Sequence, residues 1–117
     1  MSKTINKPWG YYEVLDSHEG FLIKKILVKP KEKLSLQSHK HRSEHWVVVQ
    51  GSAKVTIDEN IYNLEINESI YIPLGSKHRL ENEIDKDLVI TEVQIGDILD
   101  EDDIIRYEDI YGREVRP

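Results

Sequence analysis

A cluster of metal-ligating side chains lies in residues 31–51, KEKLSLQSHKHRSEHWVVVQG, where a glutamine, three histidines and a glutamate fall within nine residues. On an extended strand alternate side chains share a face, so Gln37, His39 and His41 are expected to point the same way. Glu44 follows after a short gap. Imidazole nitrogens, an amide oxygen and a carboxylate suit a divalent zinc, manganese, iron or cobalt ion. The segment therefore predicts most of a metal site, which needs one more ligand from elsewhere.

A second segment, residues 67–82, NESIYIPLGSKHRLEN, supplies a further histidine, His78. In the first segment, five residues separate Lys31 from Gln37, one separates Gln37 from His39, four separate His39 from Glu44, and six separate Glu44 from Gly51. In the second segment, five residues separate Asn67 from Pro73, one separates Pro73 from Gly75, two separate Gly75 from His78, and three separate His78 from Asn82. Both spacings resemble the two motifs of the cupin superfamily, in which small jelly-roll barrels hold a metal between two strand pairs.

Two turn positions depart from the cupin pattern, which has glycine where Lys31 and Asn67 stand. Asparagine tolerates a positive φ, and lysine does so less readily. We therefore expect the first turn to differ in shape.

The elements that must position these residues are short strands. Glycine, proline and asparagine divide the chain into about nine strand-like runs, and no helical stretch of ten or more residues precedes position 100. Residues 53–57 and 61–64 flank a polar turn and predict a hairpin. We expect an all-β barrel or sandwich. A short C-terminal helix is predicted over residues 101–111, where acids come first and Ile104, Tyr107 and Tyr111 recur at spacings of three and four.

Composition narrows the classes of function. The 117 residues are expected to form a single domain, 1–117, and 32% of them are charged, with no cysteine. No apolar run approaches the ~20 residues of a membrane span, and polar residues interrupt the N-terminus where a signal peptide would be apolar. We therefore expect a cytoplasmic protein that does not bind membranes.

The net charge of −6 is concentrated in residues 97–109, which carry seven acidic residues and one arginine. The rest of the chain balances, so no basic surface suggests nucleic-acid binding. We interpret the acidic run as a solvated face.

Further segments sharpen the resemblance. Gln37 stands where most cupins have a histidine, as in the metal site of phosphomannose isomerases. LSLQSHKHRSEHWVVVQGSAKVTID, SIYIPLGSKHRLEN, EVQIGD, EDDIIRYEDIYGR and KPWGYYEVLD together resemble the type II mannose-6-phosphate isomerase domain. That domain forms the C-terminal part of a bifunctional isomerase and mannose-1-phosphate guanylyltransferase in many bacteria. Nothing here resembles the nucleotidyltransferase part, so the resemblance implies a standalone isomerase domain with the cupin double-stranded β-helix fold, active in carbohydrate metabolism and GDP-mannose biosynthesis.

The resemblance also implies a ligand set, namely Gln37, His39, Glu44 and His78. His41 is an alternative to Gln37, because most cupins have two histidines separated by one residue. The four-residue gap between His39 and Glu44 favours Gln37. The implied cofactor is a divalent metal, with zinc first and cobalt, manganese, nickel or iron as alternatives.

The implied reaction interconverts mannose 6-phosphate and fructose 6-phosphate through a cis-enediol. A metal stabilises the developing enediolate oxygen, and a base near neutral pKa moves the proton. We expect His41 as this base, because its ordinary pKa suits the task, and Glu92 as the alternative, which would need desolvation. The phosphate needs cations, for which we expect Arg42, Arg79 and Lys33, since arginine's planar fork suits phosphate.

Three other functions compete with the isomerase. They are a non-catalytic metal- or sugar-binding cupin, a metal-independent sugar epimerase and an oxygen-using iron cupin. The full ligand set disfavours the epimerase. We also expect a homodimer, because pairing through sheet edges removes exposed edge strands.

Overall fold

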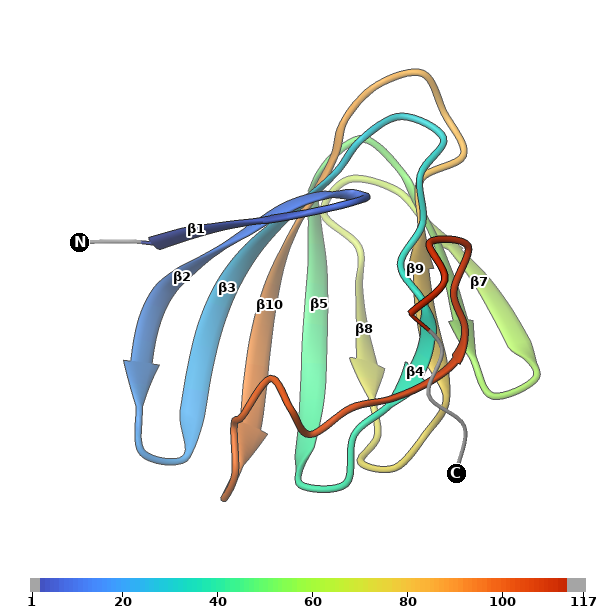
Figure 1. Cartoon of the computed structure of the whole chain (residues 1–117). Helices are drawn as coiled ribbons and strands as arrows, with labels where there is room; N and C mark the ends of the chain where they lie inside the picture. The colour runs from blue at the N-terminus through green and yellow to red at the C-terminus, as the bar shows by residue number, and fades with distance from the viewer. Residues whose placement is uncertain (1–2, 114–117) are drawn as a thin grey trace.

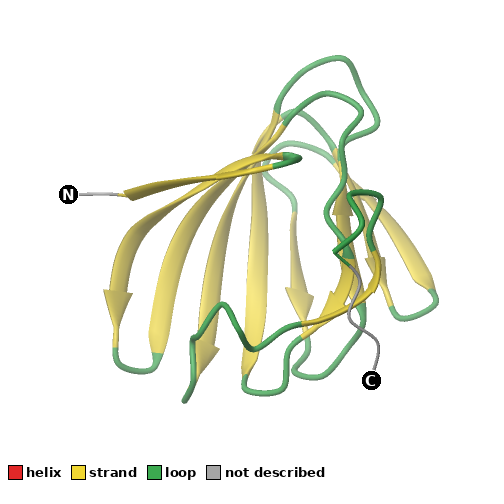
Figure 2. Ribbon diagram, viewed as in Figure 1, coloured by secondary structure: helices red, strands yellow, loops and turns green. Residues whose placement is uncertain are grey.

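Two antiparallel β-sheets face each other in the computed structural model, which describes residues 3–113 (Figures 1 and 2). One sheet has six strands in the order β1 (Lys3–Lys7), β2 (Gly10–His18), β3 (Phe21–Val28), β10 (Leu88–Gly96), β5 (Arg42–Gln50), β8 (Ser69–Ile72). The other has five in the order β11 (Ile105–Glu108), β4 (Leu36–Ser38), β9 (His78–Glu81), β6 (Ala53–Ile57), β7 (Asn60–Leu64). The prediction of an all-β fold is confirmed.

The inward-facing rows of the central strands change from apolar to polar along their length. On β5 the buried residues run from Glu44 to Trp46 and Val48, and on β10 they run from Ile90 to Glu92. The strands are antiparallel, so the polar end of each meets the polar end of its neighbour. One end of the space between the sheets is therefore a hydrophobic core, and the other end is a buried polar site.

The short C-terminal helix predicted over residues 101–111 is wrong. Residues 105–108 form β11, which pairs antiparallel with β4, and the described residues contain no helix (Figure 2). The Tyr107 hydroxyl hydrogen-bonds to Ser38 Oγ at 2.9 Å, and the Tyr111 hydroxyl donates to Glu32. Pairing with a free strand edge outweighs the weak helical spacing of the side chains. As a result the C-terminal segment runs from the end of β10 across to β4 (Figure 1).

The predicted hairpin is present as β6 and β7, with Asp58 in its turn. Lys31 and Asn67 have φ values of 66° and 74°, so both adopt the left-handed conformation that glycine would adopt. We expected the first turn to differ in shape, but Lys31 has the φ that a glycine would have there. The lysine therefore adopts a left-handed backbone conformation that is strained for a residue with a side chain. Between residues 3 and 113 there is no helix long and apolar enough to cross a membrane.

Replacing Lys31 with glycine should stabilise the protein. The left-handed conformation costs an L-residue about 1 to 2 kcal/mol, and the greater freedom of glycine in the unfolded chain offsets part of the relief. We expect a net gain of roughly 0.5 to 1 kcal/mol in the free energy of unfolding, measured by urea denaturation. Lys29→Gly is the control: φ is not positive at Lys29, so this change should destabilise. Lys31 Nζ also donates to the Glu83 carbonyl at 2.7 Å, a bond that both Lys31→Gly and Lys31→Ala remove. Lys31→Ala keeps the left-handed strain, so Lys31→Gly should be the more stable of the two, and the reverse order would contradict the strain at this turn.

Candidate metal centre

His39 lies in the connection between two strands and not on a strand. β4 ends at Ser38 and β5 begins at Arg42, so Gln37, His39 and His41 do not share the face of one strand as expected. The connection is held by Asp103, whose carboxylate accepts hydrogen bonds from the backbone N–H groups of Lys40 at 3.0 Å and His41 at 2.9 Å. The C-terminal segment thus fixes the position of the loop that carries His39.

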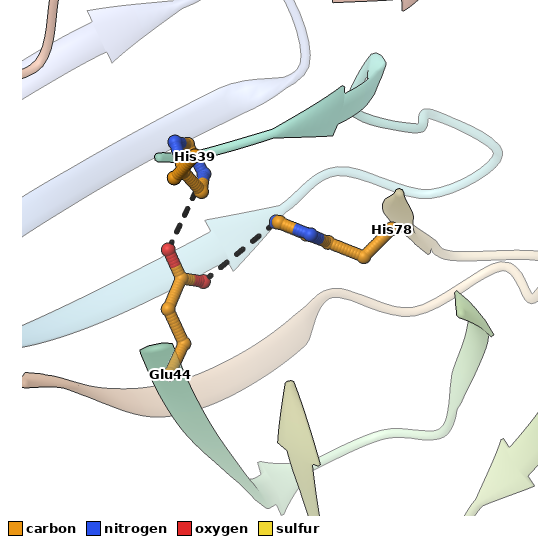
Figure 3. A group of neighbouring side chains, drawn as sticks. All are labelled: His39, Glu44 and His78. Carbon is orange, nitrogen blue, oxygen red and sulfur yellow. Dashed lines mark ion pairs between the residues drawn. The ribbon is translucent and has the colours of Figure 1, made fainter. Parts of the chain in front are cut away.

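Three buried side chains, His39, Glu44 and His78, converge between the two sheets (Figure 3). Glu44 comes from β5 in one sheet, and His78 begins β9 in the other. The Glu44 carboxylate lies 3.3 Å from His39 Nε2 and 3.9 Å from His78 Nε2, and one potential ligand atom from each residue lies within 4.8 Å of the others. Three of the four expected ligands are therefore brought together.

Hydrogen bonds fix which nitrogen of each histidine is free to bind a cation. His39 Nδ1 donates to the Asp103 carbonyl at 2.6 Å, and His78 Nδ1 donates to the Ser76 carbonyl at 3.1 Å. Each Nε2 therefore carries a lone pair, and His78 Nε2 is buried without a hydrogen-bond partner. Burial lowers the pKa of both histidines to about 4, so both are neutral at pH 7.

Arg42 neutralises the buried Glu44 carboxylate. Its Nε donates to Glu44 Oε2 at 2.8 Å, and its Nη2 donates to His39 Nε2 at 3.2 Å. The Trp46 indole N–H donates to the other carboxylate oxygen at 2.9 Å. The Glu44 carboxylate and His39 Nε2 are both acceptors and lie 3.3 Å apart. The Arg42 guanidinium donates to both and so holds them close together.

The donor set fits a divalent metal ion. Two imidazole nitrogens and a carboxylate are typical ligands of such ions, and His78 Nε2 has no hydrogen-bond partner among the described residues. Gln37 is half-buried, lies opposite His78 in the β4–β9 pairing and lines the adjacent cavity, although its Oε1 accepts from Ser35 Oγ at 2.9 Å. His41, the alternative to Gln37, is half-buried and does not line this cavity.

Glu92 is a second carboxylate in the site. It is fully buried on β10, where Trp46 Nε1 donates to it at 3.1 Å and Gln94 Nε2 at 2.8 Å. Burial, and then the charge of Glu44, raise the pKa of Glu92 to about 7. Gln94 Oε1 is buried without a partner and is free to accept a hydrogen bond.

The three residues expected to bind phosphate are separated. Arg42 lines the cavity beside the metal ligands. Arg79 is buried elsewhere, where it donates to the Leu34 carbonyl at 2.9 Å and the Glu108 carbonyl at 3.0 Å and so joins three segments of the chain. Lys33 forms an isolated bridge with Glu81 and lines a separate hollow. Only Arg42 of the three is close to the metal ligands.

Other cations that the sequence did not single out for phosphate binding also line this cavity, namely Lys7, Lys24, Arg106 and Arg113. Lys24 and Lys25 are adjacent on β3, so one of the two had to face inward. Arg106 was placed in a predicted helix. The interpretation of residues 97–109 as a solvated face is also incomplete, because Glu101 binds Lys24 at 2.5 Å and Asp103 holds the His39 loop.

The burial of Glu92 predicts how the metal-free protein responds to pH. Because the pKa of Glu92 is raised on folding, the folded state holds this proton more tightly, and stability falls as pH rises from about 4.5 to 7. In Glu92→Gln this loss is absent. Relative to wild type, the variant should gain roughly 1 to 3 kcal/mol of unfolding free energy between pH 4.5 and pH 8, measured by urea denaturation after chelation.

Burial lowers the pKa of His39 and of His78, whereas the charge of Glu92 raises it, so the removal of that charge lowers both pKa values further and acts in the same direction as the loss of the Glu92 titration. Glu59→Gln in the exposed β6–β7 turn is the matched control and should show no pH-dependent difference from wild type. A pH-independent difference for Glu92→Gln would show that the buried carboxyl does not titrate in this window.

Comparison with solved structures shows that the fold is a cupin. An oxalate decarboxylase of Bacillus subtilis aligns over 91% of this chain and 30% of its own, with a TM-score of 0.80 and 19% identity. The Cnp3 cupin domain of Schizosaccharomyces pombe aligns over 74% of this chain and 64% of its own, with a TM-score of 0.72 and 15% identity. At these identities the likeness concerns the fold alone.

Closer relatives are found by sequence. The mannose-1-phosphate guanylyltransferase ManC of Salmonella typhimurium is 51% identical over 113 residues, which are 97% of this chain and 24% of that protein. The alginate biosynthesis protein AlgA of Pseudomonas syringae is 54% identical over 93% of this chain and 23% of its own length. The chain therefore spans about a quarter of these relatives.

These names correct the expected reaction. The relatives are named as a guanylyltransferase and for alginate biosynthesis, and the Xanthomonas campestris relative, 50% identical over 111 residues, is named for xanthan biosynthesis. The assignment of this chain as a mannose-6-phosphate isomerase enzyme is therefore wrong. His41 and Glu92 were expected as bases for that isomerisation only.

The sequence profile of one family covers nearly the whole chain. It is described as "Mannose-6-phosphate isomerase C-terminal" and matches residues 1–109. Membership does not by itself assign a reaction. With its cupin fold and its match to this profile, the chain belongs to the mannose-6-phosphate isomerase C-terminal family.

Proposed function

We propose that this chain is a metal-binding cupin domain that binds a mannose phosphate beside a divalent metal ion. The observation that carries the proposal is the buried group of His39, Glu44 and His78, with an unpartnered His78 Nε2. Arg42 and Trp46 satisfy Glu44 and His39, but His78 Nε2 is a buried acceptor without a partner, which is costly unless a ligand such as a metal ion binds it.

The metal we expect is zinc, with manganese, cobalt, nickel and iron as alternatives. His39, Glu44 and His78 would hold it, and Gln37 is the nearest candidate for a fourth ligand because it lies opposite His78. Nitrogen and oxygen ligands without cysteine suit all of these ions, so the choice among them needs measurement. A bound divalent ion supplies Lewis acidity toward an oxygen of the ligand.

The proposed ligand is a mannose phosphate because of the charge of the cavity and the names of the relatives. The cavity beside His39 has more cationic than acidic groups in its lining, which favours an anionic ligand. The ManC relative is named for mannose 1-phosphate, and the family description names mannose 6-phosphate. Since the chain corresponds to about a quarter of these relatives, we propose for it a binding role within mannose-phosphate metabolism.

We also propose that two copies pair through sheet edges, because β1, β8, β11 and β7 end the two sheets with unpaired edges in the described chain. Light scattering at micromolar concentration should give twice the chain mass of 13.7 kDa. A monomeric mass would contradict this proposal.

Metal binding is tested by titrating zinc, and then the other ions, into chelator-treated protein by calorimetry. We expect one ion per chain, and affinity that is weaker by on the order of 100-fold or more in His39→Ala and His78→Ala, since each loses a ligand. His45→Ala is the matched control, because His45 is exposed on the opposite face of β5 and should bind as wild type does. Equal losses in all three variants would contradict the site.

The ligand is tested on the metal-loaded protein. Mannose 6-phosphate and mannose 1-phosphate should both bind more tightly than mannose, because only they carry an anion for the cationic cavity. If neither sugar phosphate binds better than mannose, a mannose phosphate is not the ligand.

A further inference from the structure

Arg106 lies level with Gln37 and His78 on neighbouring strands of the five-stranded sheet. In the strand pairing Arg106 is opposite Gln37, and Gln37 is opposite His78. Residues directly opposite one another on neighbouring strands point to the same face, so the three side chains share the inner face of the sheet. Arg106 also lines the cavity that His39 lines.

Among residues 3–113, the Arg106 side chain has no hydrogen-bond or ion-pair partner. Its Nε is buried without a hydrogen bond, and the described residues provide no ion pair for its guanidinium. Burial, and then the charge of Arg113, lower its pKa. Arg79 is the contrast, since it is buried but bonded to two backbone carbonyls. A buried donor without a partner costs stability, so Arg106 does not serve the fold as Arg79 does.

Lys24 faces the same cavity from the opposite sheet. It is buried on β3, its Nζ lies 4.1 Å from the centre of the Tyr12 ring, and its ion-pair partner Glu101 is half exposed at 48% of its side chain. The cavity lining contains two carboxylates, those of Glu92 and Glu101. It contains five cationic side chains, which are Lys7, Lys24, Arg42, Arg106 and Arg113. Arg42 and Arg113 are paired with the buried carboxylates of Glu44 and Asp109, whereas Lys24 is paired with the partly exposed carboxylate of Glu101.

We propose that Arg106 and Lys24 form a binding subsite for the phosphate of a phosphate monoester, on opposite walls of the cavity beside the metal ligands. The planar fork of arginine binds phosphate oxygens through two hydrogen bonds, and the lysine ammonium adds a second charge. This subsite rests on the proposed function and adds to it the residues that bind the phosphate. These residues differ from Arg79 and Lys33, which the sequence favoured.

The spacing suits a hexose monophosphate. Two strand separations lie between Arg106 and His78, which is roughly 9 to 10 Å between their backbones. Arg106 lines the cavity, and so do Gln37 and His39. A ligand with a phosphate at one end and sugar oxygens at the other can therefore reach Arg106 and the metal ligands together.

The test titrates inorganic phosphate into the protein at constant ionic strength and measures binding by calorimetry, first with the protein as isolated and then after chelation. We expect phosphate affinity to fall about ten-fold or more in both Arg106→Gln and Lys24→Gln. Lys25→Gln is the matched control, because Lys25 is the next residue of β3 and lies on its other face. It should change the affinity by less than about two-fold.

Thermal melting separates binding from structure. Arg106→Gln should melt at or above the wild-type temperature, because it removes an unsatisfied buried donor, and Arg106→Lys should restore part of the phosphate affinity. The proposal is overturned if Arg106→Gln binds phosphate as wild type does, or if Lys25→Gln weakens binding equally. It is also overturned if chelation alone abolishes binding, since the metal would then hold the anion.

The two proposals fail in different ways. Zinc binding with no phosphate binding would overturn the subsite and leave the metal centre. Phosphate binding that depends on Arg106, in a protein that binds no zinc, would support the subsite and overturn the metal centre.

Discussion

The burial of the Glu44 carboxylate between two β-sheets is the constraint on which the rest of the site depends. A carboxylate without water must be neutralised, and the chain provides Arg42 two residues earlier and the Trp46 indole two residues later on the same inward face of β5. His78 then approaches from the other sheet and His39 from the loop between β4 and β5, each with its Nε2 toward the Glu44 carboxylate. The buried polar side chains of Glu44, Arg42, His39 and His78 occupy one end of the space between the sheets, and the hydrophobic core occupies the other end. The polar end is the candidate site.

The C-terminal segment completes the site from outside the barrel. Asp103 holds the loop of His39, Glu101 pairs with Lys24, and β11 adds Arg106 to the line of Gln37 and His78. The acidic run thus provides counter-charges for a cavity that is otherwise cationic. One short segment therefore fixes a ligand loop and also supplies a wall of the binding cavity.

The sequence was sufficient to predict most of the strands, because alternation is a local property of the chain, and the family resemblance implied the convergence of His39, Glu44 and His78. Alternation alone failed for His39 and His41, which lie in the connection between β4 and β5. The sequence was not sufficient for β11, since the spacing of Ile104, Tyr107 and Tyr111 suits a helix, and only a distant free edge on β4 makes residues 105–108 a strand. The cations that line the cavity could not be identified for the same reason: whether Arg79 or Arg106 lines it depends on pairing between segments far apart in the chain. The reaction was misassigned because a family resemblance fixes a fold and a ligand set more firmly than a chemical step.

The central claim is that His39, Glu44 and His78 hold one divalent ion between the two sheets. The most direct measurement is a crystal structure of zinc-loaded protein with diffraction recorded at the zinc absorption edge. The account predicts a single strong anomalous peak within about 2.0 to 2.2 Å of His39 Nε2, His78 Nε2 and a Glu44 oxygen. Anomalous peaks only at surface residues, with Arg42 still bridging Glu44 and His39, would contradict it.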